Sequence, residues 1–334
     1  MKTSWLTDKE IQGYIEGITS GDRRVLAKAI TLVESILPAH QEAARKILDR
    51  ILPYTGKAVR LGITGLPGAG KSTFIESFGK MLTAQGHRVA VLAVDPSSPK
   101  TGGSIMADKT RMEKLATDPN AFIRPSASGG TLGGVARKTR ETMLVCEAAG
   151  FDWVMVETVG VGQSEVTVAS MVDFFLVLMI AGAGDELQGI KKGVLELADA
   201  IAINKADGDN VQRAQAARQQ YEIAFHLINP PTRIWTPPVI TCSALTGSGL
   251  QKILDLILKH RQIMTESGEL EKKRRNQNLE WFWSLVREGL ELWFFQDSLV
   301  KKAVSRMLEE VEKGARSPTS AAEEILTHLK EIPS

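Results

Sequence analysis

The stretch that most constrains how this chain folds is a glycine-rich loop at residues 65–73. It contains the pattern G-x-x-x-x-G-K-[ST], with Gly65, Gly70, Lys71 and Ser72 at the fixed positions. An apolar run before the loop predicts a buried strand, and the residues after it predict a helix. In that setting the pattern forms a phosphate-binding loop, because its glycines let successive backbone N–H groups point at one phosphate. A glycine-rich turn with a chance lysine is the competing interpretation, and the flanking pattern argues against it.

The same loop predicts which groups hold a nucleoside triphosphate. The helix that follows adds its positive N-terminal end to the phosphate site. Lys71 can reach the outer phosphates, and the Ser72 hydroxyl can hold Mg²⁺. The predicted loop contacts are Gly65, Leu66, Pro67, Gly68, Ala69, Gly70, Lys71, Ser72 and Thr73.

Composition narrows the class of protein. The chain has 334 residues, 43% hydrophobic and 24% charged, which is typical of a soluble protein with a substantial core. A net charge of +2 gives no reason to expect nucleic acid or an anionic membrane as a partner. Cys146 and Cys242 lack a C-x-x-C spacing and predict free thiols in a reducing cytoplasm. We find no apolar signal core at the N-terminus, and the longest apolar run, residues 174–183, is too short to span a bilayer.

Residues 1–56 predict a helical N-terminal extension without catalytic residues. Apolar residues recur there at three- and four-residue spacing. Asp22 and Pro38 are expected helix boundaries. The predicted helices cover residues 6–18, 23–35 and 41–51.

Residues 57–265 alternate apolar runs with helical patterns, which is typical of a mostly parallel sheet covered on both faces. We therefore predict an α/β fold, the three-layer fold of P-loop NTPases, with helical extensions at both ends. A glycine cluster at residues 126–134 is interpreted as a hinge, with an anion-binding turn as the alternative. The predicted strands cover residues 61–64, 89–94, 121–125, 151–157, 174–180, 200–203 and 239–241, and the predicted core helices cover residues 72–85, 137–149, 211–228 and 250–265.

Two aspartates follow the second predicted strand. Asp95 lies at its end, and a glycine-rich stretch leads from there to Asp108. Ligands of such sheets bind outside the carboxyl ends of the strands, so both carboxylates could contact Mg²⁺. The alternative is that Asp95 caps a turn before Pro96 and that Asp108 starts a solvated helix. With the phosphate-binding loop nearby we favour the functional role for Asp95, and both interpretations stay open for Asp108.

The fourth predicted strand ends in Glu157, with Gly160 three positions further on. This arrangement is typical of a Walker B acid followed by a glycine that senses the γ-phosphate. Glutamate replaces the usual aspartate, so the carboxylate reaches about one methylene further out. We predict that Glu157 contacts the metal directly or through water, or helps to position the attacking water. A role limited to capping the strand is the alternative.

The sixth and seventh predicted strands lead into N-K-x-D and Ser-Ala motifs, which together indicate guanine specificity. The Asp207 carboxylate can accept two hydrogen bonds from guanine, and adenine lacks that donor pair. Asn204 can tie its loop to the phosphate-binding loop, and the Ala244 N–H is expected to meet guanine O6. The predicted base contacts are Asn204, Lys205, Asp207, Ser243, Ala244 and Leu245.

Residues 266–334 predict a helical C-terminal region with three of the six tryptophans. A long helix there carries Trp281, Trp283 and Trp293 among other apolar residues. Aromatic anchors of this density suit a protein–protein interface, so we predict a dimerisation region. An intramolecular core beneath the sheet is the alternative. Two further helices are predicted over residues 299–313 and 319–330.

Assembled in this order, the motifs resemble those of the MeaB/ArgK GTPases, relatives of the human methylmalonic aciduria type A protein. The resemblance is carried by the string from Val94 to Pro99, the string from Glu157 to Glu165 and the segment at residues 182–193, and it extends over nearly the whole chain. It implies a Mg²⁺-dependent GTPase that acts as a chaperone for an adenosylcobalamin-dependent acyl-CoA mutase, typically methylmalonyl-CoA mutase.

The resemblance also implies a homodimer formed through the C-terminal helices, and no cobalamin site of the chain's own. It assigns Lys71, Asp95, Asp108 and Glu157 to the catalytic site, and the last three, with Ser72, to magnesium. No glutamine or arginine can be named as the residue that positions water; Gln163, Gln188, Lys191 and Lys192 are the candidates.

Three other functions remain open at this point. A GTPase that inserts nickel would be expected to carry a Cys or His cluster, and the five histidines here are scattered. An ArgK-like kinase would need an acceptor site, and none is recognisable. A non-catalytic nucleotide-binding module would bind GTP without hydrolysing it.

Overall fold

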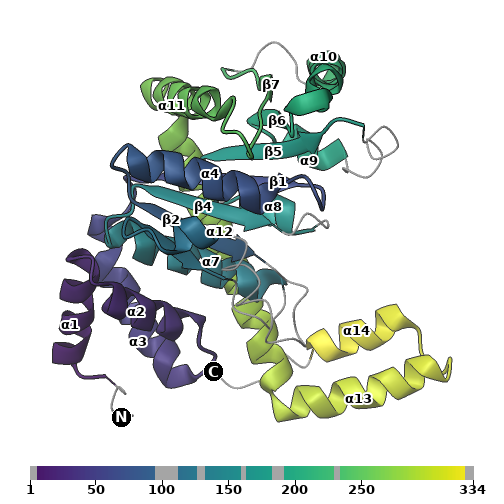
Figure 1. Cartoon of the computed structure of the whole chain (residues 1–334). Coiled ribbons are helices and arrows are strands. Elements are labelled where there is room, and N and C mark those ends of the chain that lie inside the picture. Colours follow the sequence, from purple (N-terminus) through teal and green to yellow (C-terminus); the bar gives the residue numbers. More distant parts are fainter. Residues whose placement is uncertain are drawn as a thin grey trace. The chain divides into compact units, whose positions relative to one another are not determined.

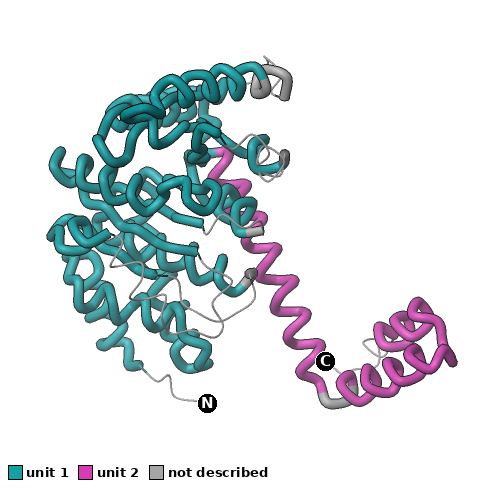
Figure 2. Tube along the Cα trace, turned by 45° about the vertical axis from the view of Figure 1, so that its right-hand side comes forward, with its two compact units in different colours: residues 1–271 teal, residues 272–334 magenta. Residues whose placement is uncertain are grey.

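The computed structural model describes residues 6–94, 112–125, 132–158, 163–182, 192–228 and 234–327. The chain divides into two compact units, residues 1–271 and residues 272–334 (Figure 2). The sheet and the predicted nucleotide site belong to the first unit. Helices make up the described part of the second.

Within the described residues, the first unit contains one sheet of seven parallel strands in the order β3-β2-β4-β1-β5-β6-β7 (Figure 1). The strand before the glycine-rich loop, β1, lies between β4 and β5 in the middle of the sheet. Every residue of β1 and β6 is buried, as expected for strands covered on both faces. The strands are β1 (Val59–Gly65), β2 (Val89–Val94), β3 (Ala121–Arg124), β4 (Trp153–Thr158), β5 (Phe174–Ile180), β6 (Ala200–Asn204) and β7 (Val239–Thr241).

Helices cover both faces of the sheet and give the three layers predicted from sequence (Figure 1). One face packs on α4 (Lys71–Ala84), α6 (Glu113–Ala116) and α11 (Leu250–Glu266). The opposite face packs on α7 (Leu132–Ala148), α8 (Gln163–Ala169), α9 (Lys192–Glu196) and α10 (Val211–Ile228). Three short helices, α6, α8 and α9, were not predicted from sequence. Helix α7 starts earlier than predicted, because residues 132–134 of the glycine cluster are already helical.

The N-terminal extension is helical, as predicted, and contributes to the core on the α7 side of the sheet. The Asp22 carboxylate accepts hydrogen bonds from two backbone N–H groups at the start of α2. Arg23 joins this extension to the sheet, because it donates to the carbonyls of Pro119 (2.9 Å) and Ala121 (2.6 Å). The elements are α1 (Asp8–Thr19), α2 (Arg23–Glu34), α3 (Pro38–Ile51) and the 3-10 turn η1 (Leu52–Tyr54).

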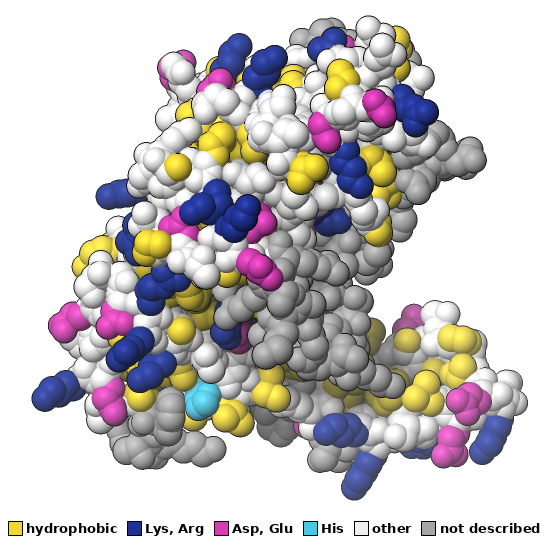
Figure 3. All heavy atoms as spheres, in the orientation of Figure 1, with side chains coloured by type: hydrophobic (Ala, Val, Ile, Leu, Met, Phe, Trp, Pro, Cys, Tyr) yellow, Lys and Arg dark blue, Asp and Glu magenta, His cyan; other side chains and the backbone are white. Residues whose placement is uncertain are grey.

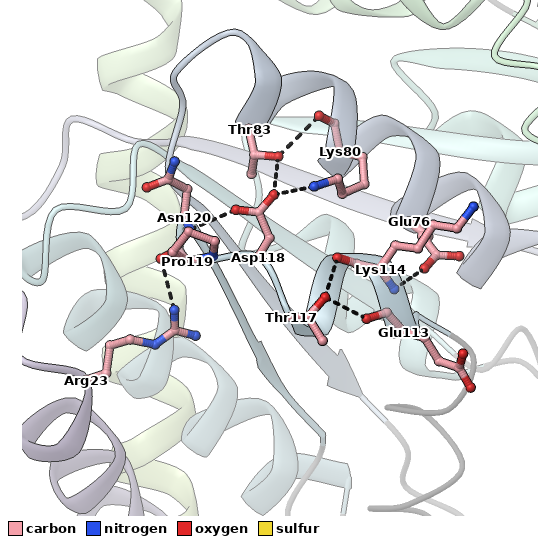
Figure 4. A network of polar contacts seen from close by, with 10 residues as sticks. All are labelled: Arg23, Glu76, Lys80, Thr83, Glu113, Lys114, Thr117, Asp118, Pro119 and Asn120. Carbon is pink, nitrogen blue, oxygen red and sulfur yellow. Dashed lines mark hydrogen bonds and ion pairs between the residues drawn. The ribbon is translucent and has the colours of Figure 1, made fainter.

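A polar network fixes α4, the helix after the glycine-rich loop, to α6 and the turn before β3 (Figure 4). Lys80 and Thr83 of α4 donate to the Asp118 carboxylate at 2.6 and 2.7 Å. The hydrogen bond from Lys80 is the main reason why the pKa of Asp118 falls to about 2. Glu76 accepts a hydrogen bond of 2.8 Å from the Lys114 N–H in the first turn of α6. These contacts hold the middle and C-terminal part of α4 against α6 and the turn before β3.

In the second unit, α13 (Ser298–Glu312) and α14 (Pro318–Thr327) form a helical hairpin. Arg316 pairs with Glu310 (2.8 Å) and Glu324, and Arg306 pairs with Glu324 (2.9 Å), so ion pairs join the two helices. The long helix α12 (Glu269–Gln296) leads into this hairpin. It carries seven apolar side chains that are between 48% and 58% exposed: Leu279, Phe282, Trp283, Leu290, Leu292, Trp293 and Phe295.

Surface charge agrees with the near-neutral composition. On the face drawn in Figure 3, basic and acidic side chains are interspersed. Among the described residues, no helix is both long and apolar enough to cross a membrane.

Candidate nucleotide site

The glycine-rich loop leaves β1 at Gly65 and enters α4 at Lys71. Two of its glycines are required by close neighbours as well as by backbone conformation. A Cβ on Gly65 would lie 2.3 Å from the Leu178 carbonyl oxygen, and a Cβ on Gly70 would lie 2.7 Å from Asn204 Nδ2. Gly70 also has a positive φ of 88°, which L side chains rarely adopt. Both glycines are therefore required for the loop to pass this close to β5 and to Asn204.

Lys71 lies within this loop and is only 9% exposed. Its Nζ donates to the carbonyl oxygens of Gly65 (2.7 Å) and Leu66 (3.2 Å). Burial lowers the pKa of Lys71, and the charges of Glu157 and Glu165 oppose that effect. A phosphate offers stronger acceptors than two carbonyls do, so Lys71 would exchange these bonds for phosphate oxygens when a nucleotide binds.

Ser72 and Glu157 are brought together, although 85 positions separate them in sequence. The Ser72 hydroxyl, in the first turn of α4, donates to Glu157 Oε1 near the end of β4 at 3.3 Å. Hydroxyl and carboxylate oxygens are the hard ligands that Mg²⁺ prefers, and a site of this kind retains waters and substrate oxygens for the other positions. The residues present therefore fit a magnesium ion beside the triphosphate.

Glu165 is a buried carboxylate that was not among the predicted site residues. It lies in the first turn of α8, is 3% exposed, and its charge acts on Lys71. Ser164 Oγ donates to its Oε2 at 3.3 Å. The sequence shows only that an acidic residue follows Glu157 by eight positions. That Glu165 is buried becomes visible only from the packing of α8.

Asn204 connects the guanine motif to the phosphate-binding loop. Its Nδ2 donates to the Ala69 carbonyl at 2.8 Å, and its Oδ1 accepts the Ala244 N–H at 2.9 Å. The expected tie between the two loops is therefore present in the structure. Lys205, the next residue, has a φ of 59°, the one positive value outside glycine in the described chain. Backbone strain of this kind occurs most often at binding and catalytic sites.

The hydrogen-bond partner of the Ala244 N–H differs from the prediction. It is bonded to Asn204 Oδ1, so it does not point freely at the position expected for guanine O6. The Leu245 side chain is 79% exposed, and its N–H makes no hydrogen bond within the described residues. Of these two N–H groups, that of Leu245 is the one available to a base.

Asp207 and Ser243 have different environments. Asp207 precedes the 3-10 turn η3 (Gly208–Asn210), and its carboxylate caps none of that turn's N–H groups. It is therefore available to accept hydrogen bonds from a base. Ser243 is fully buried, and its hydroxyl accepts the Thr246 N–H at 3.2 Å, so it shapes the loop from inside.

Several predicted site residues lie outside the described residues. They are Asp95, Asp108 and Gly160, together with Gln188 and Lys191 among the candidates for positioning water. The side chains of Gln163 and Lys192 are likewise not described. Their roles remain predictions.

The features expected of a nickel-inserting protein are not found in the part of the chain that the structure describes. There, no group of three or more His, Cys, Asp or Glu side chains is arranged to hold a metal ion. Cys146 and Cys242 are free and buried. His260 is 2% exposed and packs edge-on against Phe174 and Trp235, as a core residue does.

Comparisons with known proteins place this site in a family context. A family model described as "Methylmalonyl Co-A mutase-associated GTPase MeaB" matches residues 26–298. The chain is 49% identical to "GTPase ArgK" of Escherichia coli over 311 residues, which cover 93% of this chain and 94% of that protein. It is 45% identical to "Methylmalonic aciduria type A homolog, mitochondrial" of Mus musculus over 342 aligned positions, covering 98% of this chain and 82% of the mouse protein.

A solved structure supports the fold over nearly the whole chain. The structure described as "Crystal structure of LAO/AO transport system kinase" superposes with a TM-score of 0.79 at 41% sequence identity. The match covers 98% of this chain and 100% of that chain.

Proposed function

Because the chain belongs to the family of methylmalonyl-CoA mutase-associated GTPases MeaB, we propose that its GTPase activity serves an adenosylcobalamin-dependent acyl-CoA mutase. In this proposal GTP binding and hydrolysis gate the loading of adenosylcobalamin and protect the mutase, and methylmalonyl-CoA mutase is the expected partner. GTP hydrolysis itself follows from membership in a GTPase family. The observation that carries the proposed role is the family match over residues 26–298.

The site geometry supports the following account of hydrolysis. Water attacks the γ-phosphate in line with the leaving oxygen, and negative charge is spread over the phosphate oxygens. Loop N–H groups and Lys71, fixed at the start of α4, are positioned to stabilise that charge without reorganising. We propose that Ser72 and Glu157, with Asp95 and Asp108, hold magnesium. When bound, Mg²⁺ would neutralise charge on the β- and γ-phosphate oxygens.

We propose that the partner is recognised in a nucleotide-dependent way, and this can be tested by affinity capture. The tagged full-length protein, loaded with GDP or with a non-hydrolysable GTP analogue, is incubated with purified methylmalonyl-CoA mutase. We expect the captured amount of mutase to differ several-fold between the two nucleotide states, because a switch needs different affinities in its two states. Equal capture with both nucleotides, or none, would contradict the proposal. An acyl-CoA-binding enzyme that does not use cobalamin is the control and should not be captured.

We also propose that the second unit forms a homodimer interface. It exposes large aromatic and aliphatic side chains on α12, among them Phe282, Trp283 and Trp293, and a partner commonly covers side chains of this kind. Large aromatic anchors such as Trp283 and Trp293 often dominate interface energetics. The described hairpin offers few buried apolar residues of its own; Val300, Met307 and Ala321 are among them.

Replacing Trp293 with glutamate should dissociate this dimer. A charge in the middle of an apolar interface would be buried without a partner, so the dimer dissociation constant should rise by at least about 100-fold. Sedimentation equilibrium of the full chain measures it. Ser284→Glu is the matched control, because Ser284 is an exposed polar residue on the same helix and the variant adds the same charge. A wild-type chain that stays monomeric at all concentrations would rule out the interface.

A kinase is the second candidate, because the solved relative is described as a transport system kinase. The guanine-binding motif and the family match favour hydrolysis. Incubation with γ-labelled GTP separates the two: hydrolysis releases all label as inorganic phosphate, whereas a kinase leaves it on an arginine-containing or protein acceptor.

We propose a cytoplasmic location, with which the two free thiols are compatible. Burial raises the pKa of both, and that of Cys242 reaches about 12. Buried neutral thiols do not oxidise readily, and their free state is compatible with a reducing compartment.

A further inference from the structure

The carboxyl ends of β1 and β4 separate where the nucleotide site begins. Backbone pairing between the two strands extends from Val59 to Ile63 of β1, and the final pair is Ile63 with Glu157. Beyond that pair β1 continues only alongside β5, and β4 continues only alongside β2. The first residues without a partner on the other strand are therefore Thr64, just before the glycine-rich loop, and Thr158, just after the proposed metal ligand Glu157.

A side-chain hydrogen bond joins the strands at this point. Thr158 Oγ1 donates to Thr64 Oγ1 at 2.7 Å, and the two residues are 1% and 2% exposed. Each is the residue that follows the last backbone pair on its strand. The hydroxyl pair thus continues the contact between β1 and β4 by one step beyond the ladder.

The pair lies on the face of the sheet opposite the proposed metal ligands. Successive side chains of a strand point to opposite faces, so Thr158 points away from Glu157. Glu157 points to Ser72 on the α4 side, at 3.3 Å. The neighbouring side chains on the Thr158 face, such as Val156, belong to the core under α7 and α8. On one face the Ser72–Glu157 contact therefore joins β4 to α4, and on the other face the Thr64–Thr158 contact joins β1 to β4.

We propose that Thr64 and Thr158 are positioning residues for GTP hydrolysis, because their hydrogen bond holds the end of β4 against β1 and so fixes Glu157 relative to Ser72. Small displacements of catalytic groups are costly: an error of about 1 Å can reduce the rate by about 100-fold. The backbone ladder between β1 and β4 has its last pair at Ile63 and Glu157, so the hydroxyl pair adds a second restraint immediately beyond Glu157. The inference rests on the proposed metal-binding role of Glu157.

Three variants separate positioning from simple stability. Thr158→Val keeps the shape but leaves the buried Thr64 hydroxyl without its partner. The double variant Thr64→Val/Thr158→Val removes both hydroxyls, which costs little stability because no polar group is left unsatisfied. Thr158→Ser keeps the hydroxyl and loses a buried methyl group, so it lowers stability while retaining the hydrogen bond.

We expect kcat for GTP and thermal stability to change independently in these proteins. Thr158→Val and the double variant should lower kcat by about tenfold or more, with the Mg²⁺ concentration for half-maximal rate raised and GDP affinity nearly unchanged. Thr158→Ser should melt a few degrees lower than wild type yet keep a near-wild-type kcat. The alternative result is that kcat follows the melting temperature across the series. In that case the double variant would have a higher kcat than Thr158→Val, and Thr158→Ser would have a lower kcat than wild type. The pair would then be structural only, and the inference would be wrong.

Glu157→Gln, measured alongside, separates failure of this inference from failure of the proposed site. Loss of activity in Glu157→Gln with a normal Thr158→Val overturns the positioning role and leaves the metal site intact. A normal Glu157→Gln overturns the proposed metal site, and with it any positioning that acts through Glu157.

Discussion

Replacing Lys71 with alanine should lower kcat for GTP by about 10²–10³-fold, which corresponds to ~3–4 kcal/mol of lost transition-state stabilisation. The reason is the position of the side chain. Its Nζ is held inside the glycine-rich loop by the Gly65 and Leu66 carbonyls, where the triphosphate would bind. A single-turnover assay with saturating GTP and Mg²⁺ measures the chemical step without product release.

Lys80 provides the matched control for that variant. It lies on the same helix, nine positions later, and its partner is Asp118 and not the loop. Lys80→Ala should reduce stability, because Asp118 loses the hydrogen bond that most lowers its pKa, while kcat stays near the wild-type value. Normal hydrolysis by Lys71→Ala would show that this loop is not the catalytic phosphate site.

The acid dependence of that control follows from the same contact. The pKa of Asp118 is lowered to about 2 in the folded protein, below the usual aspartate value. The ion pair therefore contributes stability above the usual aspartate pKa, and the contribution is lost as the pH falls through about 2. At neutral pH the comparison of Lys80→Ala with wild type reports the full contribution.

The sheet could be predicted from sequence because its strands are buried on both faces. Continuous apolar runs such as residues 174–180 and 89–94 match β5 and β2 to the residue. Helix boundaries were predictable where chemistry marks them, as at Asp22, whose carboxylate caps α2, and Pro38, which starts α3. The short helices α6 and α9 were missed because four or five residues are too few to show a helical period.

Parts of the candidate site depend on contacts between distant segments, which no local pattern encodes. The motif predicted that Asn204 would tie its loop to the phosphate-binding loop, and the bond to Ala69 is present. It could not predict that the other end of the same amide takes the Ala244 N–H. The Thr64–Thr158 pair was likewise invisible, because both residues read as ordinary strand residues until the register of β1 and β4 is known.

Replacing Asp207 with asparagine should change which base the site accepts. Guanine presents an N1–H and an exocyclic amine as neighbouring donors, and the uncapped Asp207 carboxylate can accept from both. The asparagine amide keeps one acceptor and turns its NH₂ toward the guanine amine, so two donors face each other. A site built for such hydrogen bonds rejects a mismatched partner strongly, and GDP affinity should fall by at least about 100-fold, or ~3 kcal/mol.

The same substitution should improve the binding of xanthosine diphosphate, because xanthine has a carbonyl where guanine has its amine and that carbonyl can accept from the asparagine NH₂. Competition against a fluorescent guanine nucleotide measures both affinities. Asp209→Asn is the matched control: this acid is exposed in η3, two positions away, and its variant should bind GDP like the wild type. Equal losses for both diphosphates would mean that Asp207 shapes the loop without reading the base. A gain for xanthosine alongside the loss for guanosine would show that this carboxylate contacts the base edge directly, since only a direct hydrogen bond can invert the preference.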